Sequence, residues 1–177
     1  MPRFVAFLRG VSPLNARMPD LKRCFEGAGF SDVRTLLSSG NVVFSSRASP
    51  MATLERRAED AMDAGLGRSF STIVRSVQHL QGLLASDPFG QFDLPPTARR
   101  VVTFLRRPDQ SGVYLPLERD GARILAITAT EAFTAYVPNP KGPVFMTLLE
   151  RTLGVDITTR TFDTVRNLPP SLSTLWK

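Results

Sequence analysis

The sequence predicts an α+β protein that consists of two tandem β-α-β-β-α-β halves. Three observations lead to this prediction. Apolar runs of strand length alternate with segments of helical periodicity, the same order of elements occurs twice, and a stretch rich in turn residues at 87–96 separates the two series. We therefore expect one half over residues 1–86 and the other over residues 87–177.

The first half begins with a strand over residues 4–9 that is apolar on both faces, which is typical of a central, covered strand. A helix follows after Pro19, in which Leu21, Cys24 and Phe25 recur at helical spacing, so Cys24 is expected to be buried in the core. Further along we expect strands over 33–37, 41–45 and 70–74, and helices over 50–64 and 77–85.

Turn and cap residues mark several boundaries of these elements. Ser38-Ser39-Gly40 joins the second and third strands, and glycine permits the positive φ of a tight hairpin. Ser49 before Pro50 predicts an N-cap for the second helix, and Ser76 predicts one for the third.

The second half repeats this order with one uncertain segment. Strands are expected over 101–105, 124–128, 132–137 and 155–159, and helices over 143–153 and 161–168. The repeat requires a helix at 108–117, but Gly112 and Pro116 oppose one. Asp120-Gly121 is a type I′ turn signal, so a strand over 113–117 is the alternative. The order of elements in both halves is that of ferredoxin-like (alpha-beta plait) folds.

Composition excludes several classes of protein. No apolar run approaches the ~20 residues that cross a bilayer, so no membrane partner is expected. A single cysteine rules out an internal disulfide framework and fits the cytoplasm. The net charge of +6 favours an anionic partner, although the arginines that carry most of the positive charge are scattered.

Familiar catalytic and cofactor motifs are absent from the sequence. There is no phosphate-binding loop and no Gly-x-Gly-x-x-Gly, and one cysteine with one histidine cannot build an ordinary zinc site, so no metal and no cofactor are expected. His79 lies off the apolar stripe of its helix and is expected at the surface. Whether the protein is an enzyme stays open, as does its oligomeric state.

The predicted topology raises the possibility of RNA binding by base stacking on the sheet. The third strand, Ser39-Gly40-Asn41-Val42-Val43-Phe44, lacks the aromatic consensus for such stacking. The strands at 4–9 and 101–105 are apolar on both faces, so the sheets are expected to be covered. Nucleic-acid binding by surface arginines remains possible, whereas binding by sheet stacking is disfavoured.

The topology gathers polar residues along one rim of the first half. The third strand lies between the first two, so the end of strand 4–9 meets the following hairpin. Arginine with small residues and free backbone N–H groups can bind an anion, although ordinary turn chemistry explains the same residues. The candidate residues for a small anionic or phosphorylated ligand are Arg9, Gly10, Asn15, Ser39, Gly40 and Asn41.

A second polar cluster occupies residues 158–164. Thr161 or Asp163 can cap the last helix, and Arg160 can pair with Asp163. Arg160 and Asp163 are also candidate ligand-binding residues. With Arg9 they form the basis of an alternative hypothesis, a small enzyme with a cleft between the halves.

These same residues resemble a known family. Leu8-Arg9-Gly10-Val11, Gly29-Phe30, Val33-Arg34-Thr35 and the block 39–44 resemble the opening of the bacterial domain-of-unknown-function family 1697, and Thr159–Val165 is similar to its closing motif. The resemblance implies two ferredoxin-like halves in a small cytoplasmic protein with no established activity. Ser12-Pro13-Leu14-Asn15 and Thr161-Phe162-Asp163 depart from the family pattern, so a shared ligand would be bound differently here or not at all.

Overall fold

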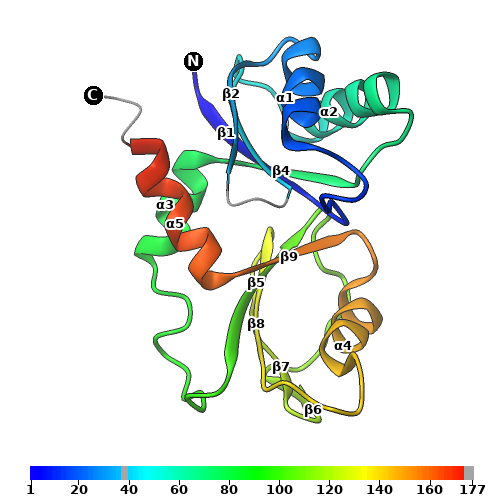
Figure 1. Ribbon diagram of the computed structural model, residues 1–177. Helices are drawn as coiled ribbons and strands as arrows, with labels where there is room; N and C mark the ends of the chain where they lie inside the picture. Colours follow the sequence, from blue (N-terminus) through cyan, green and yellow to red (C-terminus); the bar gives the residue numbers. More distant parts are fainter. Residues whose placement is uncertain (37–39, 174–177) are drawn as a thin grey trace. The chain divides into compact units, whose positions relative to one another are not determined.

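An antiparallel sheet forms the framework of each of the two units into which the chain divides, Met1–Gly82 and the residues from Leu83 on. The computed structural model describes residues 1–36 and 40–173 (Figure 1). It confirms the α+β class and the two ferredoxin-like halves. No helix in the described ranges is both long and apolar enough to cross a membrane.

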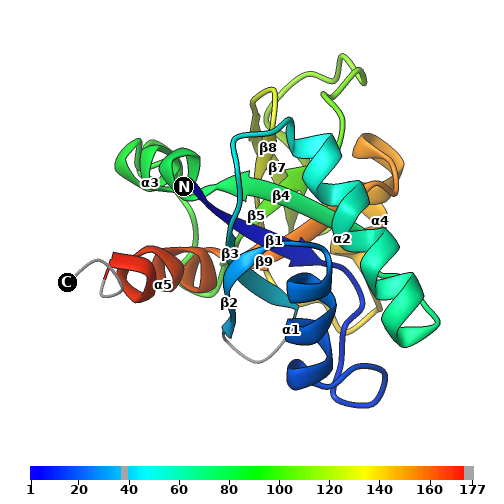
Figure 2. The same ribbon diagram turned by 90° about the horizontal axis from the view of Figure 1, so that it is seen from above.

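In the first unit the strands lie in the order β2-β3-β1-β4, and every neighbouring pair is antiparallel. The third strand therefore lies between the first two, as the sequence predicts. Helices α1 and α2 cover the same face of this sheet (Figure 2). The elements are β1 (Arg3–Leu8), α1 (Met18–Gly27), β2 (Ser31–Leu36), β3 (Asn41–Ser45), α2 (Met51–Leu66), β4 (Thr72–Ser76) and α3 (Val77–Ala85).

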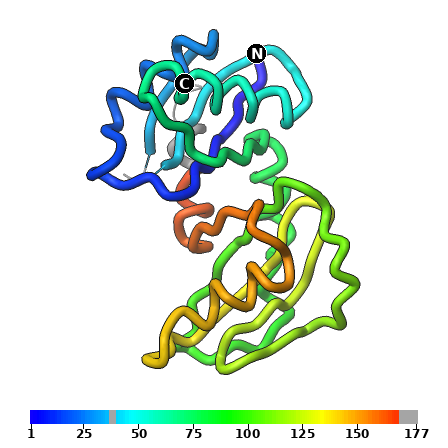
Figure 3. The backbone as a smooth tube through the Cα atoms, turned by 90° about the vertical axis from the view of Figure 1, so that its right-hand side faces the viewer, coloured from blue at the N-terminus to red at the C-terminus, as the bar shows by residue number. Residues whose placement is uncertain are grey.

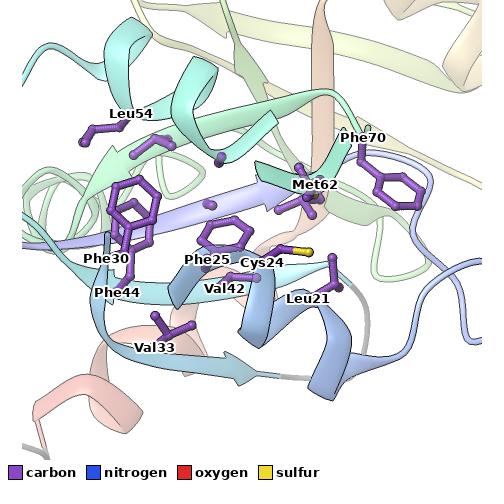
Figure 4. Close-up of a cluster of buried hydrophobic side chains, with 14 of the residues drawn as sticks. Leu21, Cys24, Phe25, Phe30, Val33, Val42, Phe44, Leu54, Met62 and Phe70 are labelled. Carbon is purple, nitrogen blue, oxygen red and sulfur yellow. The ribbon is translucent and has the colours of Figure 1, made fainter. Parts of the chain in front are cut away.

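Aromatic rings fill the core between this sheet and its helices. The rings of Phe30 and Phe44 stack with their centroids 4.2 Å apart, and Phe25 of α1 lies 5.7 Å from Phe44 (Figure 4). Such pairs stabilise a core beyond the effect of the area they bury. Cys24 is buried beside them, as predicted, and its burial raises the pKa of the thiol.

The opposite face of β1 is buried as well. Val5 and Phe7 alternate along the strand with the residues that face α1 and α2, and both are inaccessible to solvent. Val43 of β3, which pairs with Val5, is equally buried. The expectation that the first strand is covered on both faces is therefore confirmed, and this leaves no open aromatic surface on β1 for stacked bases.

The second unit repeats this arrangement and adds a strand. Its sheet has the order β6-β7-β8-β5-β9, so β7-β8-β5-β9 corresponds to the four strands of the first unit. Helix α4, orange in Figure 3, packs against one face of this sheet. The elements are β5 (Arg99–Leu105), β6 (Leu117–Arg119), β7 (Ala122–Ile127), β8 (Glu131–Tyr136), α4 (Val144–Leu153), β9 (Ile157–Thr161) and α5 (Phe162–Ser173).

The helix that the repeat requires after β5 is missing. Residues 106–116 form a loop, in which Gly112 has a φ of +63° that a helix cannot use. A strand does occur there, but it begins only at Leu117, at the end of the predicted 113–117 segment. Asp120 and Gly121, at φ values of +50° and +86°, make the predicted turn from β6 to β7.

One of the two predicted serine caps is correct. The N–H of His79 donates to Oγ of Ser76 at 3.0 Å, so Ser76 caps α3. Ser49 does not cap α2, because Pro50 occupies the N-cap position and the Ser49 hydroxyl donates to the carbonyl of Arg47 instead.

Replacing Phe44 by alanine should remove the centre of the aromatic cluster and lower the free energy of unfolding by about 3–5 kcal/mol. Urea denaturation followed by circular dichroism measures this loss. Leu14→Ala is the control, because Leu14 is 97% exposed and its truncation should change stability by less than about 0.5 kcal/mol. Equal effects of the two substitutions would contradict the packing described for Phe44.

Candidate anion-binding site

The rim predicted in the first unit is assembled by strand pairing. The N–H of Leu8, at the end of β1, donates to the carbonyl of Gly40 at 2.8 Å, and Phe7 pairs with Asn41 on β3. Arg9 and Gly10 follow Leu8 directly, and the N–H of Arg9 donates to the carbonyl of Ser71 at 2.9 Å. Ser39 belongs to this predicted set but lies outside the described residues.

The asparagines of the rim hold its backbone in place. The Asn15 amide donates to the carbonyl of Gly10 at 2.8 Å, and its oxygen accepts from the N–H of Ser12 at 2.8 Å. Asn41 is buried and donates to the carbonyl of Leu36 at 3.3 Å. Both side chains therefore make ordinary turn contacts with the backbone, which is the alternative to ligand binding for these residues.

In the second polar cluster Thr161 caps α5. Its hydroxyl accepts from the N–H of Thr164 at 3.2 Å, the contact that defines a threonine N-cap. Asp163 forms an ion pair with Arg166, one turn further along the same helix. Arg160 is largely buried and donates to the carbonyl of Thr159 at 2.8 Å, and burial lowers its pKa to about 10.

A surface pocket of about 540 Å³ lies at the start of α5. Val101 of β5 pairs with Thr161 of β9, so the beginning of β5 lies next to the point where β9 continues into α5 (Figure 1). This pairing brings an arginine pair to the first turn of a helix. The residues that line this arginine pocket are Ala98, Arg99, Arg100, Thr161, Phe162, Asp163 and Arg166.

The arginine pocket is positively charged. Three arginines and one aspartate are among the residues that line it, so the lining residues carry a formal charge of +2. The side chains of Arg99, Arg100 and Arg166 are exposed, so their donors are accessible from solvent. The guanidinium of Arg166 lies over the ring of Phe162, with its central carbon 5.2 Å from the ring centroid, which leaves its edges for hydrogen bonds. The positive end of the α5 dipole adds to this field.

Of the predicted site residues that the structure describes, Asp163 alone lines this pocket, and the sequence analysis did not propose Arg99, Arg100 or Arg166. The sequence does contain a signal for them. In the predicted topology the last strand of a half pairs with its first strand. An arginine pair at the beginning of the first strand therefore belongs near the residues that follow the last strand. In the described part of the chain no cluster of three histidine, cysteine, aspartate or glutamate side chains is arranged to hold a metal ion.

Comparison with known proteins adds a family and a fold. The family described as "Protein of unknown function (DUF1697)" matches residues 1–133. The structure of the conserved bacterial protein SP0830 from Streptococcus pneumoniae superposes with a TM-score of 0.71 and 20% sequence identity, covering 98% of this chain and 99% of that one. At that identity the likeness shows a shared fold. No curated protein matches the chain.

Replacing Thr161 by alanine should leave the first turn of α5 without its cap and lower the free energy of unfolding by about 1 kcal/mol. Thr161→Ser keeps the hydroxyl that accepts from Thr164 and should retain most of the stability. Chemical denaturation of the three proteins measures both effects. A serine variant as unstable as the alanine variant would show that the threonine methyl, and not the cap, is what matters.

Proposed function

We propose that this chain, which belongs to the DUF1697 family of proteins of unknown function, binds a small phosphate-bearing ligand in the arginine pocket. The observation that carries the proposal is that Arg99, Arg100 and Arg166 all belong to the lining of one pocket, in which Asp163 is the acidic residue among the described lining residues. The positive net charge of the whole chain supports the same class of ligand.

The chemistry of the lining favours phosphate over other anions. A guanidinium group offers two parallel N–H donors that match the oxygens of a phosphate, and the residues at the start of a helix offer backbone N–H groups that point outward. A phosphate monoester at neutral pH carries close to two negative charges, which balance the formal +2 of the pocket. A carboxylate carries one and would leave the pocket half neutralised.

Asp163 has a specific role in this proposal. Its carboxylate pairs with Arg166, so in the unliganded pocket one of the three arginines already has an anionic partner. A bound phosphate must compete with that carboxylate for Arg166 and is repelled by it. Asp163 therefore lowers the affinity for the anion and favours ligands that also gain from Arg99 and Arg100.

The rim of the first unit is a second proposed location for the same kind of ligand. The proximity of Arg9, Gly10 and Gly40 supports it. The arginine pocket is the stronger candidate, because the side-chain amides of Asn15 and Asn41 already donate hydrogen bonds to backbone carbonyls of the rim. We expect the protein to act in the cytoplasm, where the buried thiol of Cys24 stays reduced.

Nucleic-acid binding and catalysis are the competing functions. Exposed arginines also contact the phosphates of nucleic acid. A pocket at the start of one helix, however, accommodates a single phosphate group better than it accommodates a nucleic-acid strand. Among the described residues that line the pocket there is no histidine, cysteine or lysine to act as a base or nucleophile at neutral pH. Binding without chemistry is therefore the function that this geometry supports best.

The test is a titration with inorganic phosphate and with phenyl phosphate, followed by NMR chemical shifts of the backbone amides. We expect shifts concentrated at residues 99–100 and 161–166. Arg99→Gln, Arg100→Gln and Arg166→Gln should each weaken binding about tenfold, the effect of losing a charged hydrogen bond. Asp163→Asn should strengthen it, because the competing carboxylate is removed.

Arg119→Gln is the matched control. Arg119 is an exposed arginine of the same unit on β6, at the opposite edge of the sheet from β9. The Arg119→Gln variant should bind both probes with the affinity of the wild type. Equal weakening by Arg119→Gln and Arg166→Gln would mean general charge attraction and would refute the site. If an oligonucleotide binds more tightly than phosphate, and its affinity falls steeply as salt is added, nucleic acid is the favoured ligand instead.

A further inference from the structure

Arg3 is a buried arginine with more than half of its hydrogen-bond donors unused. Only 6% of its side chain is exposed. Its Nη1 donates to Oγ of Ser45 at 2.8 Å and to the carbonyl of Asp32 at 3.3 Å. Its Nε and Nη2 are buried and have no hydrogen-bond partner in the described part of the chain.

A third buried donor without a partner lies in the same row of the sheet. Ser31 of β2 pairs with Ser45 of β3, and Ser45 pairs with Arg3 of β1, so the three residues lie side by side across three strands. The hydroxyl of Ser31 is buried and also has no partner among the described residues. Paired residues of antiparallel strands project to the same face, so the three side chains share one face.

The unused atoms of Arg3 are the two that form a fork. Nε–H and Nη2–H point in the same direction along one edge of the guanidinium, and this edge binds the two oxygens of a carboxylate side by side. The third nitrogen is fixed by Ser45 and by the carbonyl of Asp32. Asp32 is a bulge residue at a φ of +48°, and the bulge places its carbonyl within reach of Arg3.

We propose that the Arg3 fork, together with the hydroxyl of Ser31, is a binding site for a carboxylate group. The free donors at this site require an acceptor, and leaving a charged donor buried without one is costly. A carboxylate supplies two oxygens in the plane of the fork and a lone pair for Ser31. This site lies in the first unit and is independent of the arginine pocket and of the function proposed for it.

The charges around Arg3 select a ligand of single negative charge. Arg3 and Arg34 are positive and Asp32 is negative, and both neighbours act on Arg3 electrostatically. The balance of +1 is neutralised by one carboxylate, whereas a phosphate dianion would leave an excess of negative charge beside Asp32. Burial lowers the pKa of Arg3, so an arriving anion would reverse an unfavourable desolvation.

The site lies close to solvent. The carboxylate of Asp32 is 77% exposed, and its Oδ2 is 3.9 Å from Nη1 of Arg3. The guanidinium therefore lies about one side-chain layer below the surface.

The experiment follows the Nε–Hε resonance of Arg3 by ¹⁵N–¹H NMR while sodium acetate is added, with sodium chloride at equal ionic strength as the reference. We expect a saturable downfield shift of Arg3 in acetate alone, and none for the exposed Arg119. Ser31→Ala should weaken acetate binding about tenfold, the effect of losing one hydrogen bond to a charged group. Arg3→Lys keeps the charge but lacks the fork, so it should abolish saturable binding, which is followed in this variant by the backbone amide resonances of Ser31 and Ser45.

Two arms separate the possible sources of the carboxylate. A shift that depends on acetate indicates a free small carboxylate. A shift that depends on protein concentration without acetate indicates a carboxylate from a second copy of the chain. If Arg3 responds in neither arm, the proposal is wrong. Because wild type and Ser31→Ala suffice for this decision, it stands even where Arg3→Lys fails to fold, which circular dichroism would reveal.

Discussion

The antiparallel pairing of β9 with β5 is the contact on which the arginine pocket depends. Arg99 and Arg100 are far from Arg166 along the chain, and the pair Val101–Thr161 brings them to one end of the sheet. The pairing also decides where α5 starts, because β9 continues into that helix without a loop. In the first unit β1 and β4 pair in the same way, so both units place their first and last strands together.

Arginine has three distinct environments in this chain, and its chemistry differs in each. The arginines of the pocket are exposed, so their charge attracts anions at little desolvation cost. Arg160 is buried deeply enough for its pKa to fall to about 10. Arg3 is buried with its fork unused. The number of arginines alone therefore says little about function, since exposure and partners determine what each guanidinium can bind.

Much of the fold could be predicted from the sequence, because local patterns specify it. The continuous apolar run of β1, the cap at Thr161 and the turn at Asp120-Gly121 each depend on neighbouring residues. The candidate site was predicted less well. Asp163 was recognised as polar and near a helix start, and its partner Arg166 lies one turn later on the same helix. The arginine pair of β5 reaches the pocket only through tertiary pairing. The bulge at Asp32 leaves no pattern in the sequence at all.

Because residues 106–116 form a loop and not a helix, the two units differ in the sequence separation between their paired strands. Without a helix after β5, strands β6, β7 and β8 follow one another through short turns as a meander, whose contacts are local. The contact of β9 with β5 closes the longest loop of this sheet, and the entropy of closure grows with loop length. Local contacts form fastest in folding, so the meander can organise before β9 arrives. The basic pocket would then be a late product of folding, completed when the chain closes on itself.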